Sequence, residues 1–110
     1  FSEIVDDNAP FHFDMEFSKA NGLDGCIVHG FLVGSIFSGL LGGQLPGPHT
    51  VINQLSLKFH LPTYIGETLF YLVVVKQISP AVGAVVLDLS AKNSCKELVV
   101  SGNATCSFIK

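Results

Sequence analysis

Asp7 and His12 are the side chains near the start of the sequence whose types and spacing could do chemistry. Pro10 lies between them, and its ring fixes its own φ and pushes Ala9 towards an extended conformation. The two side chains are therefore expected on two limbs of a rigid turn, where they can face one point in space. A carboxylate and an imidazole that converge can hold a water molecule and move its protons as a general acid and base. Capping of the turn by Asp7 and a surface position for His12 would fit the same spacing.

The segment 27–30 (IVHG) is a second candidate element, at the expected start of a long helix. First-turn N–H groups have no partner within a helix, and the helix dipole is positive there. The Gly30 N–H has no side chain to block approach, so it is suited to stabilising a developing oxyanion. His29 could act as a base, or it could pack as a hydrogen-bonded side chain beside the apolar run.

The same N-terminal side chains allow two further interpretations. Asp14 is expected to cap a short helix over residues 15–20, because a carboxylate at that position accepts from free N–H groups. His12, His29 and Asp7 or Asp14 could also form a two-histidine, one-carboxylate metal site. Their spacing matches no ligand pattern, and we expect no metal.

The element that must position Gly30 is an apolar stretch over residues 27–45. No Asp, Glu, Lys or Arg occurs from residue 25 to 57, and the stretch is long enough to cross a bilayer. Its glycines, His29 and Gln44, and the lack of a cationic flank, argue against a membrane span. We expect instead a helix of about fifteen residues, buried on nearly all sides. A small-residue stripe is expected to allow close approach to a sheet: Gly30, Gly34, Ser38 and Gly42.

Four strands are predicted after this helix. Residues 51–61 alternate apolar and polar side chains, which indicates a half-buried strand, and the apolar run 68–78 indicates a strand covered on both faces. Residues 84–91 and 98–109 complete the set. One buried helix followed by four antiparallel strands predicts an α+β, hot-dog arrangement, in which a curved sheet wraps the helix. The free edge of such a sheet favours pairing with a second copy, so we expect a homodimer.

Composition limits the possible partners and the domain count. The chain has 110 residues, which suits one domain over residues 1–110. The formal net charge is −3, with six lysines and no arginine, so a nucleic-acid partner is not expected. The three cysteines are widely spaced and suggest neither a disulfide framework nor a CxxC metal site. We expect them to be reduced and buried.

Several segments, in order along the chain, resemble the MaoC-like hot-dog family. This family includes (R)-specific enoyl-CoA hydratases and type 2 hydroxyacyl-thioester dehydratases. The strand that usually precedes the catalytic turn is expected to be missing, because only six residues precede Asp7. The matching segments are DNAPFHFD (7–14), IVHGFL (27–32), SGLLG (38–42), LPG (45–47), and Phe59 with Pro62, Gly66 and Glu67.

The resemblance implies reversible addition of water across the 2,3-double bond of an acyl thioester, giving the (R)-3-hydroxy product without a cofactor. It implies that Asp7 and His12 are the catalytic pair and that the Gly30 N–H stabilises the enolate-like thioester oxygen. Ser38 is expected near the pair. In one assignment His12 accepts a proton from water and Asp7 protonates C2. The sequence leaves the reverse assignment open.

The resemblance also suggests how the substrate is held. It places Leu41 in the wall of an acyl pocket and His29 among the substrate-binding residues. The substrate is expected to be a thioester of CoA or of acyl carrier protein. Because the chain has no arginine, lysines such as Lys58 and backbone amides would have to contact the phosphates.

Two compartments, mitochondrial or cytoplasmic, suit reduced thiols equally well. The alternative to an enzyme is a catalytically silent hot-dog subunit with a structural or acyl-binding role in a larger assembly. Retention of both Asp7 and His12 favours the enzyme.

Overall fold

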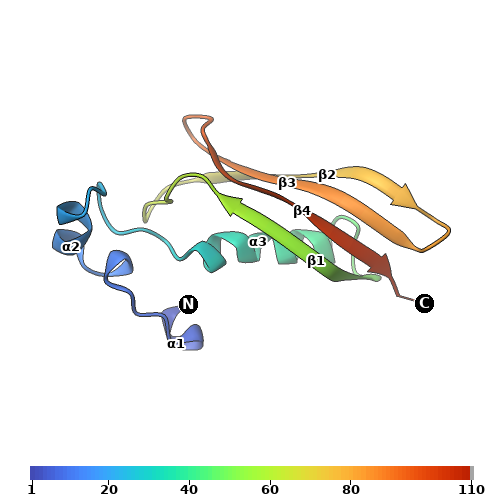
Figure 1. Ribbon diagram of the computed structural model, residues 1–110, viewed down its shortest axis with the longest axis horizontal. Helices are drawn as coiled ribbons and strands as arrows, with labels where there is room; N and C mark the ends of the chain where they lie inside the picture. The colour runs from blue at the N-terminus through green and yellow to red at the C-terminus, as the bar shows by residue number, and fades with distance from the viewer. Residues whose placement is uncertain (110) are drawn as a thin grey trace.

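The computed structural model describes residues 1–109 (Figure 1). Short helical segments come first, and they lie beyond the end of the sheet at which the long helix begins. The long helix runs along one side of the sheet. In chain order the elements are α1 (Ser2–Val5), the 3-10 helix η1 (Pro10–His12), α2 (Met15–Ala20), α3 (Gly30–Gly43), β1 (Thr50–Phe59), β2 (Leu69–Ser79), β3 (Ala84–Asn93) and β4 (Leu98–Phe108).

The four strands form one antiparallel sheet in the order β1-β4-β3-β2, so β1 and β2 are its edges. All four predicted strands are present, and their ends differ from the predicted ones by at most two residues. The predicted helix is present as α3, with fourteen residues. The α+β, hot-dog arrangement is therefore confirmed.

The core lies between α3 and the two central strands. Val33, Phe37 and Leu41 project from one face of α3 onto alternate residues of β3 and β4, because successive side chains of a strand point to opposite faces. The strand residues of this core are Val85, Leu87, Leu89, Ala91, Val100, Ala104 and Cys106. Gly102 is required where β4 approaches β1, since a Cβ there would overlap the carbonyl oxygen of Ser56.

The helix is not buried on nearly all sides, as we expected. Phe31 is 83% exposed, and Ile36 is also exposed, because the single sheet layer covers only one face of α3. The small-residue stripe is used only in its first half. Gly30 and Gly34 face Phe59 and Leu57 of β1, whereas Ser38 is exposed and Gly42 has no neighbour in its Cβ direction.

Two expectations about the strands are also wrong. Strand β2 is not covered on both faces, because α3 packs on only one face of the sheet, and on the other face Phe70, Leu72 and Val74 are exposed. In β1 the strict alternation fails at a bulge between Ile52 and Gln54, which places Val51 on the outer face. Its polar side chains after the bulge do point outwards, as predicted.

Two of the three cysteines are buried, as predicted. Cys26 and Cys106 are buried free thiols, but Cys95 is exposed in the turn between β3 and β4, so the expectation of burial is wrong for Cys95. Burial raises the pKa of the Cys106 thiol, which keeps it protonated. Within residues 1–109, no helix has the length and apolar character needed to cross a membrane.

Candidate active site

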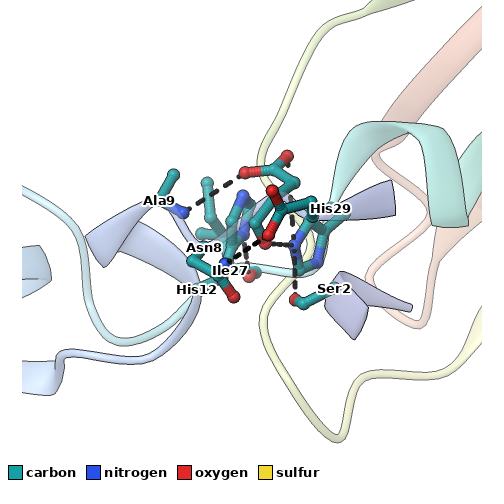
Figure 2. Close-up of polar contacts among 8 residues, drawn as sticks. Ser2, Asn8, Ala9, His12, Ile27 and His29 are labelled. Carbon is teal, nitrogen blue, oxygen red and sulfur yellow. Dashed lines mark hydrogen bonds and ion pairs between the residues drawn. The ribbon is translucent and has the colours of Figure 1, made fainter. Parts of the chain in front are cut away.

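A turn before α2 brings the first candidate residues together (Figure 2). The Ala9 N–H donates to Asp7 Oδ1 at 3.2 Å, and Pro10 begins the 3-10 turn that ends at His12. His12 Nδ1 lies 2.8 Å from the carbonyl oxygen of Ile27. Because a carbonyl only accepts, His12 Nδ1 carries the proton, and Nε2 of the neutral ring is free to accept one.

Helix α2 packs against this turn. Asp14 Oδ1 accepts from the Phe17 N–H at 3.0 Å, so the predicted helix cap is confirmed. The fully buried Ser18 hydroxyl donates to the carbonyl of Phe11, and the Phe11 and Phe17 rings meet edge to face at 5.0 Å. The turn and α2 therefore form one packed unit.

Residues 26–28 join this unit to the rest of the protein. The Ile27 N–H donates to the Phe11 carbonyl at 2.9 Å, while the Ile27 carbonyl holds His12. Ile27 also forms an isolated antiparallel bridge with Tyr64, and the Val28 N–H donates to the Thr63 carbonyl at 2.7 Å. The segment before α3 is thus bonded to the turn over residues 7–12 on one side and to the loop after β1 on the other.

His29, the N-cap residue of α3, contacts both candidate catalytic residues. Only 7% of it is exposed, and its Nε2 lies 3.0 Å from the Asp7 carbonyl oxygen and 3.0 Å from Ser2 Oγ. Since the carbonyl only accepts, His29 Nε2 carries a proton. The His29 ring stacks on His12, with centroids 3.6 Å apart and an interplanar angle of 16°. The Nε2 side of the His29 ring is therefore engaged by protein groups, and the residue also lines a cavity of about 350 Å³ together with Ser2, His12 and Leu32.

The geometry of this cluster does not fit a metal ion. One ligand atom from each of Asp7, His12 and His29 lies within 4.8 Å of the others. However, an ion bound to an imidazole lies near the plane of the ring, and two nearly parallel planes 3.6 Å apart share no such point. The Nδ1 of one ring and the Nε2 of the other are also already hydrogen-bonded to carbonyls. The cluster instead brings a carboxylate and an imidazole within reach of one water molecule.

His12 and Gly30 line the same cavity, of about 290 Å³, beside the start of α3. Among residues 1–109 no hydrogen bond engages the Gly30 N–H. A second, largely apolar cavity of about 250 Å³ adjoins the first, and the two share Val28, Val33 and Thr63. Its other lining residues are Leu32, Ile36, Glu67, Leu69 and Tyr71. The site therefore joins the cavity that contains His12 and Gly30 to a second cavity, and both are lined mainly by apolar side chains.

The structure does not bring the other predicted site residues to this cavity. Ser38 is exposed on α3, about 12 Å of helix rise beyond Gly30. Leu41 is fully buried in the core, and it lines neither cavity. Lys58 projects from the outer face of β1, because the adjacent Leu57 faces α3.

Sequence reasoning missed three residues of the site. Ser2 contacts His29 from a short helix that no pattern predicts. Ile27 acts through its backbone, which side-chain type does not reveal. Thr63 follows Pro62 in a loop, and only its pairing with Val28 brings it to the cavity.

A curved antiparallel sheet over one long helix, with an Asp–His turn at the helix start, defines an α+β protein of the hot-dog class. The family model for the MaoC like domain matches residues 1–93, and the chain belongs to this family. The resemblance found in the sequence is thereby confirmed.

Relatives and solved structures agree with this membership. The chain is 42% identical over 67 residues to an (R)-specific enoyl-CoA hydratase of Aeromonas caviae, covering 61% of this chain and 50% of the relative. It is 33% identical over 107 residues to the mitochondrial 3-hydroxyacyl-[acyl-carrier-protein] dehydratase FERN of Solanum lycopersicum, covering 96% and 64%. A solved (R)-hydratase from A. caviae matches with a TM-score of 0.93 at 32% identity, over 98% of this chain and 82% of that one. The chain thus spans about half to two thirds of the curated relatives it matches.

Proposed function

We propose that the protein is a hydro-lyase that reversibly hydrates trans-2-enoyl thioesters to (R)-3-hydroxyacyl thioesters in fatty-acid metabolism. The observation that carries this proposal is the convergence of Asp7 and His12 beside a cavity that also contains the unengaged Gly30 N–H. The names of the Aeromonas and Solanum relatives, a hydratase and a dehydratase, support the same reaction.

His12 acts as the base toward water. Its Nδ1 proton is held by Ile27, so Nε2 accepts a proton as the water oxygen bonds to C3 of the enoyl group. Asp7 delivers a proton to C2 on the same side. Transfer of the proton from His12 to Asp7 then restores both groups, and dehydration runs these steps backwards. The bond from His12 Nδ1 to Ile27 makes Nε2 the atom that exchanges protons, and this geometry also fits the reverse assignment, with Asp7 as the base and His12 as the acid.

The start of α3 stabilises the charge that develops during the reaction. As C3 is attacked, negative charge moves to the thioester oxygen, and the Gly30 N–H donates to it at the positive end of the helix dipole. The adjoining cavity with Leu32 and Ile36 takes the acyl chain. His29 holds the Asp7 carbonyl and stacks on His12, so it acts as a positioning residue.

Turnover of crotonyl-CoA, followed as loss of absorbance at the enoyl band, tests the proposal. We expect hydration to the (R) product, identified by a stereospecific dehydrogenase for (R)-3-hydroxybutyryl-CoA. The same assay with crotonyl–acyl carrier protein compares the two carriers. A folded protein that turns over neither thioester would contradict the proposal and favour the catalytically silent subunit.

We also propose that two chains pair along the free edge of β1. On the helix-facing side of β3 and β4 the apolar side chains are buried. On the same side of β1, Ile52, Leu55 and Phe59 are exposed. An antiparallel pair of β1 strands would cover this apolar surface together with Phe31 of α3.

Light scattering coupled to size exclusion measures this association. Leu55→Lys places a charge in the expected interface and should give a monomer. Val74→Lys is the matched control, because Val74 is similarly exposed on the other edge strand. A monomeric parent protein, or dissociation by Val74→Lys alone, would contradict pairing along β1.

Relatives from Solanum lycopersicum and Arabidopsis thaliana are named as mitochondrial. Of the two expected compartments, these names favour the mitochondrion. A fluorescent fusion to the full reading frame, imaged with a mitochondrial marker, distinguishes it from the cytoplasm.

A further inference from the structure

Thr63 is the unusual polar residue of the cavity. It is 6% exposed, and within residues 1–109 its Oγ1 is the one buried side-chain polar atom without a hydrogen-bond partner. Buried hydroxyl groups normally have a partner, because leaving one unpaired costs most of its hydration free energy. Oγ1 itself has almost no accessible surface, so a partner can reach it only when the side chain turns the hydroxyl toward the cavity that Thr63 lines.

The position of Thr63 limits what this partner can be. Thr63 lies in the wall shared by the two cavities, one containing His12 and Gly30 and the other apolar. The Val28 N–H donates to the Thr63 carbonyl, so Thr63 lies beside Val28, which is two residues before Gly30 in the chain. The acyl thioester proposed above must cross this junction to place its acyl chain in the apolar cavity.

We infer that on substrate binding the Thr63 hydroxyl turns into the cavity by rotation about χ1, which breaks no existing hydrogen bond, and donates to the thioester carbonyl oxygen as a second donor beside the Gly30 N–H. This inference rests on the proposed function. A carbonyl oxygen has two lone pairs, and oxyanion sites in proteins generally combine two or more donors. Helix α3 offers one exposed amide at this point, and Thr63 supplies the other donor. The bond strengthens as the oxygen gains negative charge, so Thr63 lowers the barrier more than it tightens substrate binding.

Thr63→Val tests this role, because valine has nearly the same shape and lacks the hydroxyl. We expect kcat for crotonyl-CoA hydration to fall roughly 10- to 100-fold, with a smaller change in KM. We expect Tm to stay the same or rise, because an unpaired buried hydroxyl is removed. Thr63→Ser keeps the hydroxyl and should retain kcat within about fivefold of the parent protein. Thr105→Val makes the same change on the outer face of β4 and should leave kcat unchanged.

Different results separate failure of this inference from failure of the proposed function. If the parent protein is active and Thr63→Val keeps full kcat, the hydroxyl is not a donor to substrate. If Thr63→Val and Thr63→Ser lose activity equally, the effect is one of packing, and the inference is overturned.

A second measurement applies if the parent protein turns over no enoyl thioester. Calorimetric titration with butyryl-CoA, a saturated thioester, should then show weaker binding by Thr63→Val than by the parent chain. Equal affinity, or no binding by either protein, would also overturn the inference.

Discussion

The two ends of α3 are held by different interactions. At its first turn, Gly30 and His29 lie beside a cavity, and polar contacts connect them to the catalytic turn and to the loop after β1. Two and three turns later, Phe37 and Leu41 are completely buried against β3 and β4 and make the centre of the core. One continuous helix therefore carries the site at one end and most of its own anchoring at the other.

This difference separates stability from chemistry. Burial of large apolar side chains supplies most of the folding free energy, so the C-terminal half of α3 fixes the helix on the sheet. The catalytic turn lies beyond the sheet and depends on a few hydrogen bonds around Ile27. Substitutions at the two ends should thus change different measured quantities.

Leu41→Ala should produce the largest effect, at the buried end. We expect a loss of roughly 2–5 kcal/mol in the free energy of unfolding, because the cavity left behind cannot be refilled. Urea denaturation measures this loss, and Leu45→Ala, at an exposed position, is the control. The resemblance places Leu41 in an acyl pocket instead. A stable Leu41→Ala protein that accepts longer acyl chains would support that pocket and contradict a core role.

Asp7→Asn should produce the largest effect at the site. Asparagine can still accept from the Ala9 N–H but cannot exchange the proton, so kcat should fall about 10²-fold or more. The midpoint of urea unfolding should not change. Asp24→Asn removes another exposed acid of the N-terminal segment and serves as the control. Unchanged kcat in Asp7→Asn would remove Asp7 from the mechanism.

His29→Phe tests the connection between the two regions. Phenylalanine keeps an aromatic ring against His12 but loses the hydrogen bond to the Asp7 carbonyl. We expect kcat to fall roughly tenfold with KM nearly unchanged, as for the loss of one orienting hydrogen bond. His49→Phe, at an exposed position, is the control. A selective rise in KM would show instead that His29 contacts substrate, as the resemblance implies.

Tyr71→Phe should produce the smallest effect. Tyr71 Oη donates to the Val33 carbonyl at 2.7 Å, and losing this bond should cost about 1 kcal/mol of stability. Burial raises the pKa of Tyr71 above its usual value of 10.0.

The pH dependence of this effect follows from linkage. The unfolded tyrosine ionises first as pH rises, so the stabilising contribution of Tyr71 is complete below about pH 10 and is lost above it. Urea midpoints of the parent and Tyr71→Phe proteins should therefore differ by a constant amount below about pH 10 and converge as the pH rises above it. A difference that stays constant or widens over that rise would contradict the sign of the pKa shift.

Much of the fold was predictable from local patterns. Alternation marked β1, a continuous apolar run marked β2, and the uncharged stretch marked α3. The Asp14 cap and the turn at Pro10 depend on neighbours within a few residues, so they could be predicted as well. Burial could not be predicted in the same way, because apolar runs look alike whether one face or two are covered. For this reason the predicted burial was wrong for the outer face of β2 and for the exposed face of α3.

Within the site, too, the features that depend on local structure were predictable and those that depend on distant contacts were not. Residue types and short spacing identified Asp7, His12 and Gly30, since a rigid turn and a helix start are local structures. Three other contacts join residues from 15 to 35 positions apart. The His29 ring stacks on His12, the Ile27 carbonyl accepts from His12, and the Thr63 carbonyl accepts from the Val28 N–H. Such contacts form only when segments distant in the chain pack together, because a local pattern does not record which side chains meet.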